Sequence, residues 1–180
     1  MNKYESLKQA ASAYRADEPM KNHTSFQVGG PADIFLEPEN EEEFARLVGI
    51  CLDENIPFYV LGNGSNLLVR DGGYRGAVIC TKKLHGIDID GNTLTVHAGD
   101  SLKDTAAAAQ AAGLTGLEFA SGIPGSAGGG IRMNAGAYDG EMKDVVESVR
   151  VLDENGQIVE IPAEDLNFSY RHSLLQERPI

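Results

Sequence analysis

The stretch Gly116 to Tyr138, GLEFASGIPGSAGGGIRMNAGAY, limits more than any other what this chain can fold into. Six glycines fall between positions 121 and 136, with Pro124 among them. Glycine inside a helix or strand costs roughly 0.5–1 kcal/mol relative to alanine, so this density predicts a loop. Its backbone must adopt positive φ or be approached closely by another group, and inward-turned amides of such loops bind anions. The alternative is a tight structural turn, which rarely runs this long.

A second glycine loop, GNGSN at positions 62–66, follows the apolar run FYVL at 58–61. Two such loops, each at the end of a strand-like run, suggest two clamps on one polyanionic ligand. Neither is a standard nucleotide motif. Leu67 stands where a G-x-G-x-x-G fingerprint requires its last glycine, and no G-x-x-x-x-G-K-[ST] occurs. A Rossmann or P-loop interpretation is therefore disfavoured.

The length of the chain limits the number of domains, and its net charge limits the classes of binding partner. The 180 residues suffice for one domain or two closely packed lobes. A net charge of −12 argues against nucleic acid or an anionic membrane as a partner. An acidic chain can still bind phosphates through backbone amides, as the glycine loops suggest.

The cysteines, histidines and N-terminus carry little signal. Cys51 and Cys80 lie in apolar surroundings without C-x-x-C spacing, which favours buried free thiols over a metal site or redox pair. The four histidines show no metal-ligand spacing, so no metal site is expected. The first residues lack the apolar core of a signal peptide, and no run of 18 apolar residues occurs. A cytoplasmic location is expected.

Hydrophobic periodicity predicts an α/β lobe in the first half of the chain. Residues 3–15 are predicted to form an amphipathic helix, whose apolar stripe either packs onto the body or binds a partner. Residues 33–37 read as a short strand. Asn40, with Glu43 as in a capping box, starts a helix over 41–54. Strands are expected at 58–61 and 77–81.

The second half predicts antiparallel strands. Residues 87–97 alternate around the turn Asp90-Gly91-Asn92, which indicates a hairpin. Ser101 caps a helix from Leu102 to Ala112. Residues 145–152 and 157–161 form another hairpin.

Four motifs in order carry a family resemblance: GNGSN at 62–66, GIPGS at 122–126, NAGAY at 134–138 and Y-R-x-S at 170–173. In this the chain resembles the UDP-N-acetylenolpyruvoylglucosamine reductase family, flavoenzymes of bacterial cell-wall precursor synthesis. The segment N-x-T-S-F-x-V-G-G-P-A-D at 22–33 also resembles the start of that family's FAD domain. The resemblance covers nearly the whole chain.

The resemblance implies an α+β, two-lobed FAD-binding domain of the vanillyl-alcohol-oxidase (PCMH) type, with FAD between the lobes. The implied parts are an N-terminal helix (1–19), an α/β lobe (20–85), an α+β lobe with antiparallel strands (86–176), and the first residues (177–180) of a substrate-binding domain otherwise missing. The cofactor-binding residues carried over are Leu61, Gly62, Asn63, Gly64, Ser65, Asn66, Ser121, Gly122, Ile123, Pro124, Gly125, Ser126, Gly128, Gly129, Asn134, Ala135 and Gly136.

The family reaction converts UDP-N-acetylglucosamine enolpyruvate to UDP-N-acetylmuramate in peptidoglycan synthesis, with NADPH as hydride donor. A positioned cation should stabilise the enolate that develops on the substrate carboxylate. Arg171 matches the family's arginine for this role, and a guanidinium binds carboxylate bidentately. Without the resemblance, Arg171 reads as a surface arginine. Tyr138 and Tyr170 are candidate substrate contacts, with structural packing as the alternative.

One departure limits this expectation. The family carries a proton-donating serine and a late glutamate in a domain that follows Y-R-x-S, and neither has a counterpart before Ile180. The chain alone is therefore expected to be incomplete for catalysis. A non-catalytic FAD- or nucleotide-binding module that acts with a partner chain is the alternative. Another oxidase of this superfamily lacks support, because no histidine or cysteine lies in a motif for covalent flavin attachment.

Overall fold

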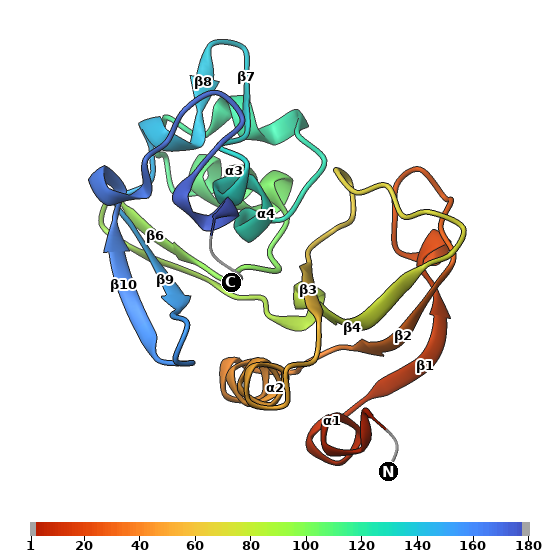
Figure 1. Cartoon of the computed structure of the whole chain (residues 1–180). Helices are drawn as coiled ribbons and strands as arrows, with labels where there is room; N and C mark the ends of the chain where they lie inside the picture. Colours follow the sequence, from red (N-terminus) through yellow and green to blue (C-terminus); the bar gives the residue numbers. More distant parts are fainter. Residues whose placement is uncertain (1–2, 178–180) are drawn as a thin grey trace. The chain divides into compact units, whose positions relative to one another are not determined.

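The computed structural model describes residues 3–177. The chain divides into two compact units. The first comprises the chain up to Leu84 together with Glu154–Gln157, and the second comprises His85–Asp153 with the chain from Ile158 onward. Figure 1 traces these segments. The predicted segment 177–180 lies, apart from Glu177, outside the described residues.

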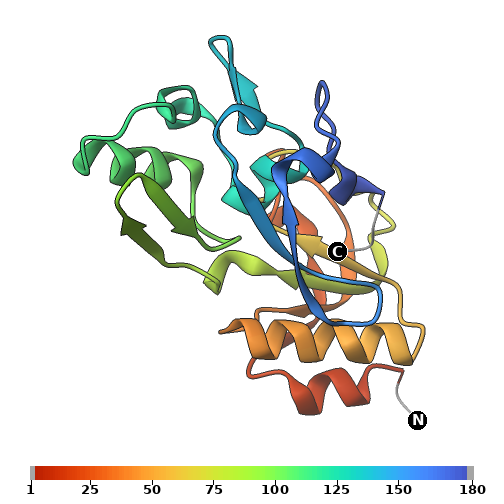
Figure 2. The ribbon, with the colours of Figure 1, turned by 90° about the vertical axis from the view of Figure 1, so that its left-hand side faces the viewer.

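The first unit is built on a four-stranded sheet with the order β1-β2-β4-β3. Strand β1 runs antiparallel to β2, whereas β2 and β3 both run parallel to β4. The strands are β1 (Tyr14–Pro19), β2 (Pro31–Leu36), β3 (Phe58–Leu61) and β4 (Tyr74–Cys80). Helices α1 (Glu5–Ala10) and α2 (Glu41–Asp53) lie side by side, as Figure 2 shows. One face of the sheet buries Met20, Ala32, Phe35, Leu61, Val78 and Cys80.

Helix α2 begins as its sequence predicts. The Asn40 side chain accepts a 2.9 Å hydrogen bond from the Glu43 amide, which caps the helix. The Glu43 carboxylate, however, does not close a capping box on Asn40. It accepts hydrogen bonds from the amides of Glu39 (2.9 Å) and Ser12 (2.5 Å). Glu43 thereby ties the start of α2 to the segment that follows α1.

The predicted N-terminal helix is too long. Helix α1 ends at Ala10, and the chain from Tyr14 to Pro19 forms strand β1. Tyr14 pairs with Leu36 across the β1–β2 ladder. As the edge strand of the sheet, this segment gains backbone hydrogen bonds to β2 along its length, which outweighs a weak helical preference. The described part of this predicted helix is therefore a short helix followed by a strand.

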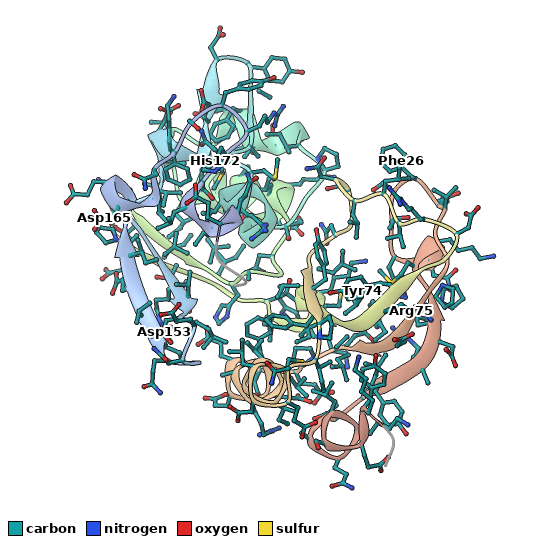
Figure 3. The ribbon with its side chains drawn as sticks, viewed as in Figure 1. Phe26, Tyr74, Arg75, Asp153, Asp165 and His172 are labelled. Carbon is teal, nitrogen blue, oxygen red and sulfur yellow. The ribbon has the colours of Figure 1, made fainter. Side chains whose placement is uncertain are left out.

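Two further contacts define the first unit. The Tyr4 hydroxyl donates a 2.6 Å hydrogen bond to Asp33, and burial together with this carboxylate raises the pKa of Tyr4 to about 12. Arg75, labelled beside Tyr74 in Figure 3, pairs with the other oxygen of Asp33 at 2.7 Å.

Cys51 and Cys80 are buried free thiols, as predicted, and burial raises the pKa of Cys51 to about 12.

The second unit contains three antiparallel hairpins among the described residues. They are β5 (Ile87–Asp90) with β6 (Thr93–Val96), β7 (Gly136–Ala137) with β8 (Gly140–Glu141), and β9 (Ser148–Leu152) with β10 (Ile158–Pro162). The unit also holds helices α3 (Leu102–Ala111) and α4 (Ala127–Arg132). The hairpins predicted at 87–97 and at 145–161 are confirmed. Ser101 caps α3 by accepting from the Asp104 amide at 3.0 Å, also as predicted.

Short 3₁₀ helices join these elements. They are η1 (Met20–Asn22), η2 (Thr81–Lys83), η3 (Glu118–Gly122), η4 (Met142–Asp144), η5 (Ala163–Leu166) and η6 (Leu174–Gln176). Two apolar clusters support the second unit. One contains Leu102, Ala106, Phe119, Ala120, Ala135 and Met142, and the other contains Ile161, Leu166 and Leu175. Within residues 3–177 no helix is long and apolar enough to span a bilayer.

Candidate functional site

The first glycine loop packs backbone to backbone against the segment before β2. Gly64 is buried with φ +67, and a Cβ atom there would lie 1.9 Å from the carbonyl oxygen of His23. The Ser25 amide donates to the Gly64 carbonyl at 3.0 Å. The His23 ring in turn stacks on Phe35, with ring centroids 4.0 Å apart. Glycine at 64 is therefore required by the fold of this unit.

The polar residues of this loop are differently placed. Asn63 and Ser65 are half-buried and Asn66 is exposed. Within residues 3–177 none of these three side chains makes a hydrogen bond to the protein. Leu61, by contrast, ends β3 in the core, and its carbonyl accepts from the Thr81 hydroxyl at 3.3 Å. The loop thus presents uncommitted polar groups on a fixed backbone.

The central glycine stretch is not a continuous loop, which corrects the prediction. Residues 127–132, AGGGIR, form α4, and Glu118–Gly122 form η3. Ser126 caps α4 by accepting a 3.4 Å hydrogen bond from the Gly129 amide. None of the glycines between 121 and 136 has a left-handed φ. Positive φ, one of the two predicted alternatives for this stretch, occurs instead at Gly116, Asn134 and Tyr138.

Close packing explains two of the three glycines of α4, Gly128 and Gly130. A Cβ at Gly128 would lie 3.0 Å from the Cβ of Ala98, and one at Gly130 would lie 3.0 Å from Leu102. The Gly128 amide donates to the Ala98 carbonyl at 3.1 Å. A helix can approach the 98–102 segment this closely only without side chains on that face. Close approach, the other branch of the prediction, holds here.

Gly122 differs from its neighbours. It is exposed, its φ is not left-handed, and a Cβ built there would meet no atom within 4 Å. Neither conformation nor packing within the protein requires glycine at this position. The missing side chain leaves open space in which a ligand can reach the backbone. Nearby, Ser121 and Pro124 are also exposed, whereas Ile123 packs partly against the core.

Some residues predicted to contact the cofactor instead make contacts within the protein. Asn134 is 2% exposed, and its amide group is hydrogen-bonded to Glu141, Lys143 and Ser169. Ala135 is buried in the core of the second unit. A Cβ at Gly136 would lie 2.6 Å from the Gly140 carbonyl oxygen, so glycine there serves the β7–β8 pairing.

The β7–β8 hairpin projects from the second unit in Figure 1. Tyr138 and Asp139 form its two-residue loop, with φ of 50° and 65°. Positive φ at both positions is the type I′ geometry, which is normally built from glycine or asparagine. Tyr138 is 91% exposed.

A cavity of about 360 Å³ lies beside this hairpin within the second unit. Its lining includes Tyr138 and Asp139 from the hairpin and Glu118 and Phe119 from η3. Hydrogen bonds from the Thr115 hydroxyl and the Gly116 amide lower the pKa of Glu118. Glu118 could not be predicted from the sequence, because a single carboxylate between apolar residues matches no motif. Among the described residues no three His, Cys, Asp or Glu side chains gather closely enough to hold a metal ion.

Tyr170 and Arg171 form another exposed two-residue turn. Tyr170 is 88% exposed, and Arg171 adopts φ 55 with its guanidinium 6.0 Å from the Tyr170 ring centroid. Both residues are accessible to a ligand. The alternative that Tyr138 and Tyr170 serve packing is not supported by these exposures.

Comparison of the sequence with known proteins shows the family to which the chain belongs. The model of a family described as FAD binding domain matches residues 32–162. The chain belongs to this family of FAD-binding domains. It is 51% identical over 156 residues to UDP-N-acetylenolpyruvoylglucosamine reductase from Clostridium novyi, a match that covers 87% of this chain and 51% of that protein. The chain thus spans about half the length of the curated relatives it matches.

Solved structures agree. The structure of UDP-N-acetylenolpyruvylglucosamine reductase from Thermus caldophilus matches with a TM-score of 0.76 and 39% identity, over 89% of this chain and 57% of that one. A berberine-bridge-enzyme-like (BBE-like) protein of Physcomitrella patens matches all of this chain and 42% of that one, with a TM-score of 0.67 and 16% identity, which shows the fold alone. The predicted α+β fold of this flavoprotein superfamily and the family resemblance are confirmed.

The residues present fit the cofactor of the family. FAD is long and carries a diphosphate, so it needs bare backbone and polar groups without internal partners. In the second unit Gly122 has exposed backbone, and in the first unit the side chains of Asn63, Ser65 and Asn66 make no hydrogen bond within residues 3–177. Other predicted contact residues instead make contacts inside the protein, namely Gly64, Ser126 and Asn134.

Proposed function

We propose that this chain is the FAD-binding part of a cytoplasmic, NADPH-dependent reductase that converts UDP-N-acetylglucosamine enolpyruvate to UDP-N-acetylmuramate in peptidoglycan synthesis. Relatives of that name at about 50% identity support the proposal. The observation that carries it is the match of residues 32–162 to the family of FAD-binding domains, within which Gly122 is exposed and free of packing.

In this proposal the two glycine segments hold the cofactor. Residues 61–66 contribute polar side chains, and residues 121–126 contribute exposed backbone. FAD, when bound, supplies the hydride chemistry of the reaction. The protein's own task is to fix the reacting groups and to stabilise charge that develops during the reaction.

Arg171 is proposed to meet that charge. Adding hydride to an enolpyruvyl double bond places negative charge on the adjoining carboxylate as an enolate. A guanidinium stays protonated at all relevant pH values and offers paired donors to a carboxylate. Arg171 is exposed and lies on an ordered turn, which suits this task. Tyr138 and Tyr170 are the proposed substrate contacts, since each presents its ring to solvent.

The test is a titration of the purified chain with FAD, followed by flavin absorbance and fluorescence. Gly122→Val should leave thermal unfolding unchanged, because no protein atom lies within 4 Å of the new Cβ. The same variant should weaken FAD binding at least about tenfold, because the side chain occupies the ligand's approach.

Gly49→Val is the matched control. Gly49 lies in α2, and a Cβ there also meets nothing within 4 Å. This variant should bind FAD as the unaltered chain does. An FAD affinity that Gly122→Val leaves unchanged would remove residues 121–126 from the cofactor site. Failure of the unaltered chain to bind FAD would count against the proposal as a whole.

A further inference from the structure

The turn that carries Arg171 is closed on itself but adopts a disfavoured conformation. The amides of Ser169 and His172 each donate to the other's carbonyl at 3.1 Å, and His172 is labelled in Figure 3. Arg171 lies between them at φ 55. Few residues with a Cβ adopt this left-handed conformation. Such residues persist where the surrounding structure over-determines them, and they cluster at functional sites.

Asn134 holds one side of this turn. Its Nδ2 donates to the Ser169 carbonyl at 3.0 Å and to the Glu141 carboxylate at 2.5 Å. Its Oδ1 accepts from the Lys143 amide at 3.0 Å. Both donor hydrogens of a side-chain amide are therefore used. The buried amide joins the Ser169–His172 turn to β8 and η4.

Gln176 holds the other side. Its Nε2 donates to the Arg171 carbonyl at 2.8 Å and to the Arg132 carbonyl at 3.0 Å. The fully buried Ser173 also donates to the Arg132 carbonyl, at 2.8 Å. The end of α4 is thereby the base on which the residues after Arg171 rest.

These contacts fix the backbone of Arg171, whereas its exposed side chain makes no hydrogen bond or ion pair within residues 3–177 and lies beside the Tyr170 ring. We propose that Asn134 and Gln176 are positioning residues, which hold Arg171 in its left-handed turn so that its guanidinium meets the substrate carboxylate. This rests on the proposed function, in which Arg171 stabilises the enolate. A long side chain on a loose turn would lose that orientation, and misplacement of about 1 Å can cost 100-fold in rate. Asn134, expected from the resemblance to contact FAD, is here assigned to Arg171.

Trypsin measures the anchoring directly in this chain. Cleavage after Arg171 requires local opening of the turn, so its rate follows the population of the open form. Asn134→Gly deletes the amide while tolerating the φ of 41° at that position. Cleavage after Arg171, followed by mass spectrometry, should become about tenfold faster in Asn134→Gly and in Gln176→Ala. Cleavage after the exposed Arg150 in β9 of the second unit should not change.

Asn55→Gly is the matched control. Asn55 has φ 52 and is exposed in the first unit, so the same substitution removes an amide at the same backbone conformation. It should not alter cleavage after Arg171. If Asn134→Gly also accelerates cleavage after Arg150, the second unit has unfolded, and Gln176→Ala with Asn134→Asp then decides. The aspartate keeps an acceptor for Lys143 but removes the donors to Ser169 and Glu141.

The kinetic arm uses the full-length protein that contains this chain. Both anchor variants should slow the step in which substrate reoxidises the reduced flavin, by about 10- to 100-fold. Flavin reduction by NADPH and FAD content should stay unchanged, which a general structural defect would not spare.

Unchanged cleavage after Arg171 in all anchor variants would overturn the anchoring. Faster cleavage with an unchanged substrate step would overturn the positioning role. If the unaltered full-length protein does not reduce the enolpyruvyl substrate, the proposed function fails, and so does this role for Arg171. The cleavage result would then still report whether the two residues hold the turn.

Discussion

The carbonyl oxygen of His23 lies 1.9 Å from the position that a Cβ atom would take at Gly64. The loop after β3 and the segment before β2 are thus in direct backbone contact. Gly64→Ala should destabilise the first unit by about 2–4 kcal/mol, because alanine disfavours φ +67 and its methyl group would force the two backbones apart. Urea unfolding monitored by circular dichroism measures the loss.

The control for this change is Gly72→Ala. Gly72 lies in the turn before β4, has no left-handed φ, and a Cβ there meets no atom within 4 Å. Its replacement should change stability by less than about 1 kcal/mol. Equal stability of the Gly64 and Gly72 variants would contradict the contact between the two segments.

Glu43 makes the first unit sensitive to acid. Burial favours the neutral carboxyl, but hydrogen bonds from the amides of Glu39 and Ser12 outweigh it and lower the pKa of Glu43 below 4.5. A carboxyl with a lowered folded-state pKa contributes stability above its unfolded pKa, and this contribution disappears as pH falls through the folded pKa. Glu43→Gln should therefore cost about 1–2 kcal/mol at pH 7.

The pH dependence of that difference is the check. The stability gap between the unaltered chain and Glu43→Gln should be full above about pH 4.5 and should shrink below it. Unfolding curves at pH 7, 5 and 3.5 measure the gap. A gap of equal size at all three values would show that the charge of Glu43 contributes nothing.

Local signals in the sequence predicted the elements whose causes are local. Asn40 and Ser101 are side chains that cap helices directly, so the starts of α2 and α3 could be read from the sequence. The Gly91-Asn92 loop likewise predicted the β5–β6 hairpin. Cys51 and Cys80 were placed in the core by their apolar neighbours.

The remaining features depend on residues distant in sequence. Tyr14 continues a helical stripe, but pairing with Leu36 draws it into β1. In the sequence, Gly128 and Gly130 are typical of a loop. Only the structure shows that they lie in a helix packed closely against Ala98 and Leu102. The hydrogen bond from the Asn134 side chain to the Ser169 carbonyl could not be predicted from the sequence, because the two residues are 35 positions apart. The motif NAGAY indicated an important segment but not the direction in which its asparagine points.

In the loop of the β7–β8 hairpin, a substitution is expected to raise stability rather than lower it. Asp139 adopts φ 65, which glycine tolerates better than aspartate. Asp139→Gly should therefore raise or maintain stability, by up to about 1 kcal/mol. Thermal unfolding of the chain measures this. A clear loss of stability would mean that the Asp139 side chain supports the hairpin by a contact of its own.

Arg171 provides the decisive test of the proposed chemistry. In the full-length protein, Arg171→Ala should leave FAD binding and flavin reduction by NADPH intact, because neither step needs a cation at the substrate carboxylate. The step in which substrate reoxidises the flavin should slow by about 100- to 1,000-fold, the usual loss for one donor to a developing oxyanion.

Arg171→Lys separates charge from geometry at this position. Lysine keeps a positive charge but cannot make paired hydrogen bonds to a carboxylate, so it should recover only part of the lost rate. Anaerobic stopped-flow absorbance of the flavin resolves the two half-reactions, and added guanidinium should partly restore Arg171→Ala but not Arg171→Lys. Because Arg171 sits on an exposed turn, neither variant should change the unfolding temperature appreciably. An unaffected reoxidation rate in Arg171→Ala would return this residue to the role of an ordinary surface arginine, since its charge would then have no bearing on the enolate.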